Sequence, residues 1–149
     1  MSNDTDWNLH LASILQEFAC QTGTIHRSGD GKTLHLVCQV GVPDSLLDKV
    51  AIIPFGKGIA GAAAERMEPV ELCNLQEDLG GVAKVDARKT GVSGSIALPI
   101  FRDLTGPVIG TLGIGKFAPY EFTDAEKRRL EQIATEIALL FDHKASAGD

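Results

Sequence analysis

The sequence predicts an α+β domain with a central, mainly antiparallel sheet of about five to six strands. The first observation is a pair of hairpin turns, at residues 28–31 (Ser-Gly-Asp-Gly) and 103–106 (Asp-Leu-Thr-Gly), each lying between two strand-like segments. The second is the helical spacing of apolar residues near both ends of the chain. Strands joined by short hairpin turns pair antiparallel. We therefore expect the terminal helices on one face of the sheet, and the inner helices and a lid loop on the other.

Length and composition fit a single domain. The chain has 149 residues, of which 44% are hydrophobic, enough for one core. We expect this core over about residues 6–142, with flexible ends at 1–5 and 144–149. The net charge of −6 argues against a nucleic-acid partner. Without an apolar run long enough for a membrane span, and with a polar, acidic N-terminus, we expect a cytoplasmic protein with no membrane partner.

The two terminal helices have clear signals. The first is capped at Asp4, Thr5 or Asp6, and the last, running to about Asp142, opens with a capping box from Thr123 to Glu126. Their predicted core stripes are Trp7, Leu11, Ile14, Leu15 and Phe18 in the first helix and Leu130, Ile133, Ala134, Ile137 and Phe141 in the last.

A homodimer is expected through these terminal helices. Leu139 and Leu140 lie outside the core stripe of the last helix, which indicates a second buried face. Trp7, near the start of the first helix, is the third residue assigned to this interface.

Strands are expected at residues 24–27, 33–40, 50–53, 69–72, 95–102 and 107–117, and a short helix at 45–49. Alternation in the second strand places Leu34, Leu36, Cys38 and Val40 on one face and His35 on the other. The last two strands carry bulky residues on one face and small ones on the other. The small face leaves room for a ligand or for a closely packed helix. Its residues are Ser95, Ala97, Pro99, Thr111, Gly113 and Gly115.

A glycine-rich turn leads into an inner helix at residues 53–61 (Ile-Pro-Phe-Gly-Lys-Gly-Ile-Ala-Gly). It does not match the phosphate loop GxxxxGK[ST]. A helix N-terminus carries free N–H groups and a positive dipole end, so Lys57 and residues 58–60 are candidates for holding an anion. The glycines equally fit close packing of a helix on a sheet, and both interpretations stay open.

Residues 76–94 form a long polar segment without a clear period. Loops of this length in a compact domain are often functional lids. This one carries Lys84, Arg88 and Lys89, which are either solvated side chains or positive charges that close over a bound anion.

The three cysteines, Cys20, Cys38 and Cys73, are an odd number at wide spacing. There is no Cys-x-x-Cys pair and no Cys/His cluster with metal-site spacing. We expect free thiols, no metal and no cofactor.

Four segments resemble the GAF domain, a small-molecule sensor fold: residues 53–61, 95–100, 108–114 and 122–126, in that order. The resemblance covers nearly the whole chain and implies the fold. It does not imply one ligand, because GAF domains bind many small molecules or none. One branch, the free methionine-R-sulfoxide reductases, uses a reactive thiolate. Here the motif cysteine position is Ala60, the second cysteine falls at about Arg88, and the substrate-binding glutamate falls at Ser95, so we expect no such activity.

The function expected from the sequence is a non-enzymatic sensor of a small anionic metabolite. The resemblance to stand-alone nitrate-sensing GAF proteins implies a signalling partner such as a histidine kinase. The alternatives are a ligand-free dimerisation scaffold and a thiol enzyme using Cys73. The residues expected to contact the ligand are Lys57, Gly58, Ile59, Ala60, Lys84, Arg88, Ser93, Ser95, Ala97, Thr111, Gly113 and His35.

Overall fold

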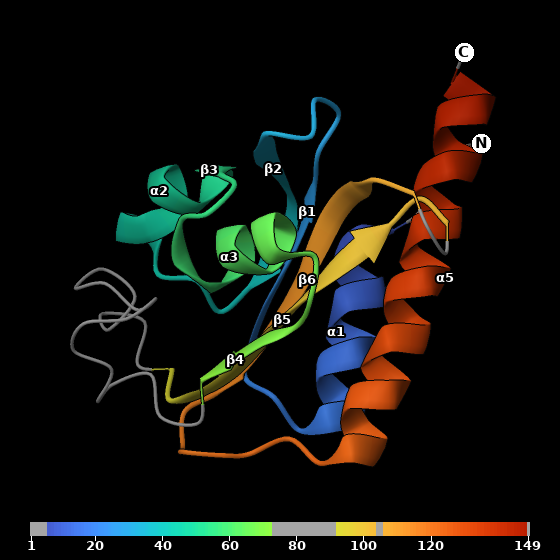
Figure 1. Ribbon diagram of the computed structural model, residues 1–149. Coiled ribbons are helices and arrows are strands. Elements are labelled where there is room, and N and C mark those ends of the chain that lie inside the picture. Colours follow the sequence, from blue (N-terminus) through green and yellow to red (C-terminus); the bar gives the residue numbers. More distant parts are fainter. Residues whose placement is uncertain (1–5, 73–91, 104–105, 149) are drawn as a thin grey trace.

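The computed structural model describes residues 6–72, 92–103 and 106–148. Within these ranges, six strands form one antiparallel sheet in the order β3-β2-β1-β6-β5-β4 (Figure 1). The predicted antiparallel sheet is confirmed. The strands are β1 (Thr22–Arg27), β2 (Thr33–Val40), β3 (Ile52–Pro54), β4 (Val70–Leu72), β5 (Gly94–Phe101) and β6 (Val108–Lys116).

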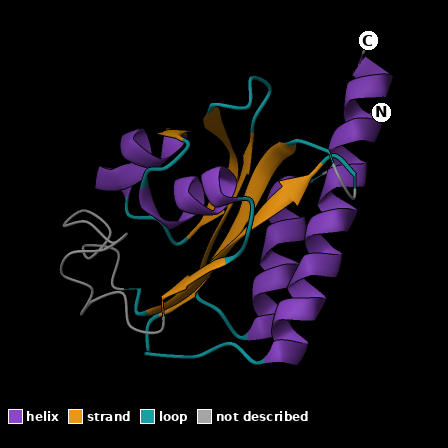
Figure 2. Ribbon diagram, viewed as in Figure 1, coloured by secondary structure: helices purple, strands orange, loops and turns teal. Residues whose placement is uncertain are grey.

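Helices cover both faces of the sheet (Figure 2). The terminal helices α1 (Trp7–Phe18) and α5 (Asp124–Gly148) lie side by side on one face. On the other face lie the inner helices: a short 3-10 turn (Asp44–Leu46), α2 (Leu47–Ala51) and α3 (Gly58–Arg66). This arrangement of helices is the predicted one, whereas most of the predicted lid at residues 76–94 lies outside the described residues.

The main core lies between the sheet and the terminal helices. Asp6 caps α1, accepting a hydrogen bond from Leu9 N at 3.1 Å. Apart from Trp7, which is half-buried, the predicted stripes of both helices are buried. The helical spacing was therefore sufficient to find this core. Its large buried side chains include Leu11, Ile25, Ile96, Leu98, Leu112, Leu130, Ile137 and Phe141.

The predicted capping box opens α5. Thr123 N donates to Glu126 Oε1 at 2.9 Å, and Glu126 N donates to Thr123 Oγ1 at 3.0 Å. Tyr120 donates its hydroxyl to the same Glu126 oxygen at 2.7 Å, which ties the preceding loop to the helix. The helix continues to Gly148, so the end predicted near Asp142 was wrong.

A β-bulge in β2 overturns the predicted faces of this strand. Ile25 of β1 pairs with Cys38, but the next residue, His26, pairs with Leu36, so Val37 is an extra residue. One extra residue reverses the alternation. Cys38 therefore packs in the main core, whereas Leu34 packs against α3 with Ala64. The two were predicted on one face.

Small residues hold α3 on the other face. Ala62 and Ala63 pack against Ala97 of β5 and Val70 of β4, and Ala64 packs against Leu34 and Val108. Alanines allow the helix to approach the strands closely. No helix within the described part of the chain is long and apolar enough to span a bilayer.

Candidate functional site

The sheet face beneath α2 and α3 carries rows of small and polar residues. Strand register places Thr24 beside Gly113, and Gly113 beside Ala97. In the next row His26 lies beside Thr111, and Thr111 beside Pro99. A Cβ added to Gly113 would lie 3.2 Å from Thr24 Oγ1, which confirms that both positions point to this face. The predicted small-residue face is therefore formed by β1 as well as by β5 and β6.

His26 is the most constrained polar side chain of this face. It is 1% exposed, and its Nε2 lies 2.8 Å from the carbonyl oxygen of Val50, at the end of α2. A carbonyl oxygen can only accept, so Nε2 carries the proton and the neutral ring has a bare lone pair at Nδ1. Nδ1 is buried and has no hydrogen-bond partner among the described residues.

Thr111, the cross-strand neighbour of His26, has an unpaired group as well. The residue is 0% exposed, and its Oγ1 makes no hydrogen bond within the described ranges. An unsatisfied buried polar group costs about 1–3 kcal/mol. Two such groups side by side therefore indicate a place where a ligand or an ordered water completes the hydrogen bonding.

Burial lowers the pKa of His26 from its ordinary value of 6.5, and His35 lowers it further, while the bond to Val50 raises it. His35 is the titratable group whose charge acts on His26 among the described residues. The folded state thus binds a proton on His26 less readily than the unfolded chain does. Stability is complete above the unfolded pKa and falls as the pH drops below about 6.5.

We predict a specific pH dependence from this shift. The unfolding free energy of the wild type should decrease between pH 7.5 and pH 5.5 more steeply than that of His26→Gln, which has no imidazole here. Urea unfolding at both pH values, followed by circular dichroism, measures the two slopes. Equal slopes would show that His26 protonates as freely in the folded protein as in the unfolded chain.

The residues predicted from the sequence to bind a ligand fall into three groups. Thr111, Ala97 and Gly113 lie together on the face beneath α3, but Ala97 already packs against the helix. Ser95 lies on the same face, and its hydroxyl donates to Ile114 O at 3.4 Å. Ser93, just before β5, is buried.

The second group lies at the start of α3. Lys57 is the exposed residue preceding the helix, and no side chain of the described residues caps this N-terminus. Gly58 has a φ of +66°, which favours glycine. The side chains of Ile59 and Ala60 pack against neighbouring apolar clusters, so only their backbone N–H groups are available to a ligand.

The third group does not contribute to the described site. Lys84 and Arg88 lie outside the described residues. His35 is exposed and pairs across the strands with Arg27. The side chain of Arg27 points to α5, so His35 lies on the α5 side of the sheet as well. The predicted place of His35 on the pocket floor was therefore wrong. The bulge in β2 is the physical reason. His26 takes the position instead. The polar alternation of Thr22, Thr24 and His26 in β1 was the signal that would have indicated it.

Neither cysteine that the structure describes has the environment of a nucleophile. Burial raises the pKa of Cys20 and of Cys38 to about 11, so both are protonated thiols at neutral pH. Cys38 donates to the carbonyl oxygen of Trp7 at 3.5 Å, on the opposite side of the sheet from α3. Cys73 lies outside the described ranges. No cluster of metal-ligating side chains is present in the described part of the chain.

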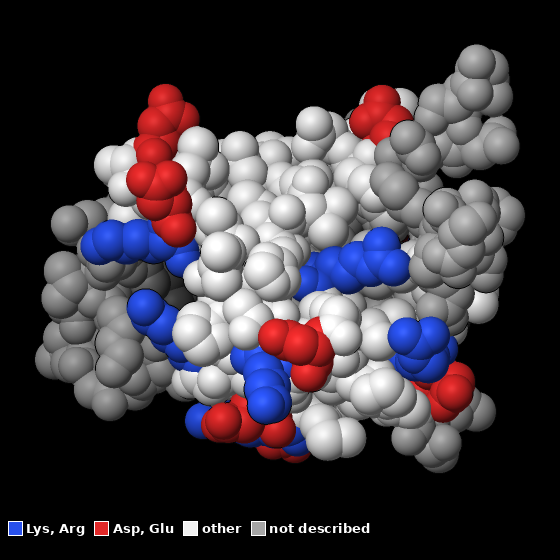
Figure 3. All heavy atoms as spheres, turned by 90° about the horizontal axis from the view of Figure 1, so that it is seen from above, with Lys and Arg blue, Asp and Glu red and all other residues white. Residues whose placement is uncertain are grey.

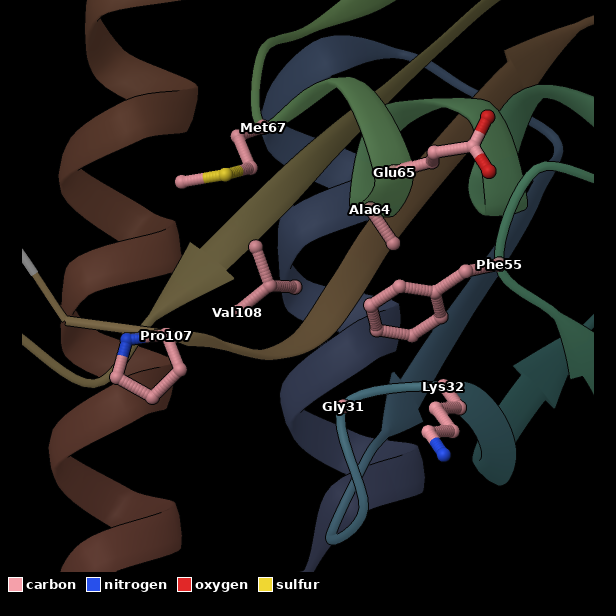
Figure 4. A pocket seen from close by; sticks show the side chains of 8 residues that line it. All are labelled: Gly31, Lys32, Phe55, Ala64, Glu65, Met67, Pro107 and Val108. Atoms are coloured by element: carbon pink, nitrogen blue, oxygen red, sulfur yellow. The ribbon is translucent and has the colours of Figure 1, made fainter.

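A separate hollow of about 530 Å³ lies between the β1–β2 turn, the end of α3 and the start of β6 (Figure 4). Viewed from above, as in Figure 3, charged side chains lie both near the middle of the surface and toward its edges, with uncharged surface between them. The polar atoms found unpartnered and buried on the sheet face are not part of this hollow. Its lining residues are Gly31, Lys32, Phe55, Ala64, Glu65, Met67, Pro107 and Val108.

The sequence profile of the GAF domain matches residues 9–142. The chain belongs to the GAF domain family. This match covers the sheet, α1, α2, α3 and most of α5, so nearly the whole chain is one GAF domain. The resemblance of the glycine-rich turn, the last two strands and the capping box is confirmed. None of the curated proteins matches this chain.

Solved GAF structures share the fold at low sequence identity. The GAF domain of a phosphoenolpyruvate-protein phosphotransferase from Coxiella burnetii superposes with a TM-score of 0.78 at 21% identity, over 94% of this chain and 82% of that one. Free methionine-R-sulfoxide reductase from Neisseria meningitidis, solved with its substrate, gives 0.75 at 22% identity, over 97% and 83%. A domain described as part of a two-component sensor histidine kinase from Sinorhizobium meliloti gives 0.73 at 16% identity, over 98% and 97%.

By their names, these neighbours come from a phosphotransferase, a sensor histidine kinase and a reductase. The fold is therefore established, and it is generally a regulatory or sensory one. Identity below 25% carries no information on the ligand.

Proposed function

We propose that this GAF domain is a non-enzymatic sensory module that binds a small polar metabolite on the sheet face beneath α2 and α3. The observation that carries the proposal is the pair of buried, unpartnered atoms, His26 Nδ1 and Thr111 Oγ1. Both atoms belong to the sheet face that carries small side chains. Small-molecule sites typically place a few such polar groups among apolar ones.

The metabolite is proposed to carry a negative charge. The first turn of α3 presents backbone N–H groups and the positive end of the helix dipole, and Lys57 precedes it. The protein has a net charge of −6, so long-range attraction does not help an anion. Recognition has to be local. The signal would pass to a cytoplasmic partner protein such as a histidine kinase, and the likeness to the Sinorhizobium meliloti domain supports this arrangement.

A sensor is favoured over a thiol enzyme by the residues themselves. Ala60 replaces the cysteine that the reductase motif carries, and the thiols of Cys20 and Cys38 are protonated and lie away from the site. Catalysis by a thiolate needs a lowered pKa. Cys73 remains the candidate for such chemistry, and a rate of alkylation no faster than that of a free model thiol would exclude it.

A thermal-shift screen of small carboxylates and inorganic anions tests the proposal. A ligand stabilises the folded state by about 2.7 kcal/mol when its concentration is 100 times its dissociation constant. A binding compound should raise the melting temperature of the wild type and raise that of Thr111→Val less. Lys32→Ala, in the hollow of Figure 4, should respond like the wild type. A melting temperature that no compound raises would favour the ligand-free scaffold.

We also predict a homodimer through the terminal helices. Leu139 is 63% exposed and Leu9 is 68% exposed on these helices, and Leu140 is half-buried. Trp7 also packs within the subunit, where its ring centroid lies 5.2 Å from that of Phe141. Leu140→Glu should give a folded monomer in analytical ultracentrifugation, because a charge would be buried at the interface.

Met67→Glu is the matched control for the dimer. It introduces the same charge at a side chain that is 57% exposed beyond the other face of the sheet, so the dimer should persist. A wild type that sediments as a monomer at high concentration would contradict the prediction.

A further inference from the structure

We infer that the ligand of the proposed site donates a hydrogen bond to His26 Nδ1, through a hydroxyl, an amine or an amide N–H group. The inference rests on the proposed function and names the chemical class of the ligand group that lies against β1 and β6. It follows from the arrangement of four atoms: His26 Nε2, Val50 O, His26 Nδ1 and Thr111 Oγ1.

The first step is the tautomer of His26. Nε2 must donate to Val50 O, 2.8 Å away, because the carbonyl has no proton to give. The ring is neutral in its 1%-exposed position, so Nδ1 presents a lone pair. The hydrogen bond from Nε2 to Val50 O therefore leaves Nδ1, on the other side of the ring, as an acceptor.

The second step is what Nδ1 can accept from. Thr111 is its cross-strand neighbour, and its hydroxyl could in principle donate, but the structure has no hydrogen bond between the two. Both atoms are left to a third group. A carboxylate or carbonyl oxygen placed against Nδ1 would set one lone pair against another. Only a donor satisfies it, and the Thr111 hydroxyl, which can donate or accept, is left for a further group of the ligand.

The third step concerns the neighbouring row. Gly113 has no side chain, and Thr24 Oγ1 borders it on the same face. A second hydroxyl therefore lies one row from the first, beside a residue without a side chain. The face offers an acceptor and hydroxyls rather than a fixed positive charge. A negatively charged end of the ligand would therefore lie away from this face, toward the first turn of α3.

Two pairs of isosteric probes test the inference. L-lactate and pyruvate share a carboxylate and differ in the hydroxyl, and acetamide and acetone share a carbonyl and differ in the N–H₂ group. The donor-bearing member of a pair should bind about tenfold or more tightly, because an unpaired buried acceptor costs that much. Titration followed by ¹⁵N NMR of the histidine rings gives both the affinity and the Nδ1 resonance, which should move only with the donors.

His26→Gln is the decisive variant. Its amide N–H₂ can still reach Val50 O, whereas the acceptor at the Nδ1 position is lost. In this variant, lactate and pyruvate should bind with about equal affinity, and so should acetamide and acetone. Thr111→Val should weaken both members of each pair and keep the preference. This second variant prevents a folding defect in His26→Gln from deciding the outcome.

The possible results separate the two proposals. Equal binding of the donor and acceptor members, with Nδ1 unmoved, overturns the inference and leaves the proposed function standing. A donor preference that survives in His26→Gln overturns it as well. Binding of none of the four probes, with Nδ1 unchanged, counts against both, because the unpaired atoms would then serve ordered water alone.

Discussion

Phe141→Ala should lower the free energy of unfolding by about 3–5 kcal/mol, the range found for truncating a buried aromatic residue. Phe141 is 1% exposed, near the meeting point of α1, α5 and the sheet. The guanidinium of Arg27 lies 5.0 Å from the ring centroid of Phe141. The ring centroid of Trp7 lies 5.2 Å from the same point. A Cβ on Gly110 of β6 would lie 3.0 Å from the ring. Truncation therefore leaves a cavity with walls from three elements.

Urea unfolding followed by tryptophan fluorescence is a suitable measurement, because the single tryptophan contacts the deleted ring. Gln132→Ala is the matched control, since Gln132 is exposed on the same helix, and it should change the stability by less than about 0.5 kcal/mol. A loss from Phe141→Ala below about 1 kcal/mol would mean that the end of α5 does not contribute to the cooperative core.

The terminal helices could be predicted because their signals are local. The apolar stripe of α5 and the capping box from Thr123 to Glu126 depend on spacings of three and four residues along one chain segment. Both signals can be recognised without knowing which other element the helix packs against. The same spacing says nothing about what lies beyond the stripe, so the dimer through Leu139 and Leu140 remains a prediction.

The register of β2 could not be predicted. Apolar residues occupy both faces of this strand, so the pattern does not distinguish one register from another. The bulge at Val37 places Leu34 and Cys38 on opposite faces of the sheet. His35 was placed on the site for that reason. His26 was missed because β1 was expected to start at Thr24, which hid the alternation beginning at Thr22.

The glycine-rich motif at residues 53–61 left two interpretations open, an anion cradle and a packing device. Spacing alone could not decide, because both need a residue without a side chain. The structure supports the packing interpretation for Gly61, whereas anion binding at Gly58 is a proposal. Gly61 is buried where α3 passes close to the turn, whereas Gly58 is half-buried, with a φ of +66°, and opens the helix.

Gly61→Ala should destabilise the protein by about 2–3 kcal/mol, at the upper end of overpacking. A Cβ on Gly61 would lie 2.6 Å from Pro54 O and 3.1 Å from Gly56 N, both backbone atoms that cannot swing away. Gly61 O accepts a hydrogen bond from Gly56 N at 2.7 Å, so the turn and the helix are joined at the same point. The methyl group therefore has to push α3 from β3 or break this bond.

The same displacement should reach the candidate site, which gives the prediction a second readout. Ala62 and Ala63 follow Gly61 and rest on Ala97, so a shift of α3 opens the layer that covers Thr111 and His26. We expect Gly61→Ala to lower the urea midpoint and to make the Thr111 amide exchange faster with deuterium. Gly29→Ala, where an added Cβ has no described atom within 4 Å, should do neither. If Gly61→Ala instead kept the wild-type midpoint, the close approach of α3 to β3 would not be a constraint of the folded state, and the motif glycines would have to be explained by binding.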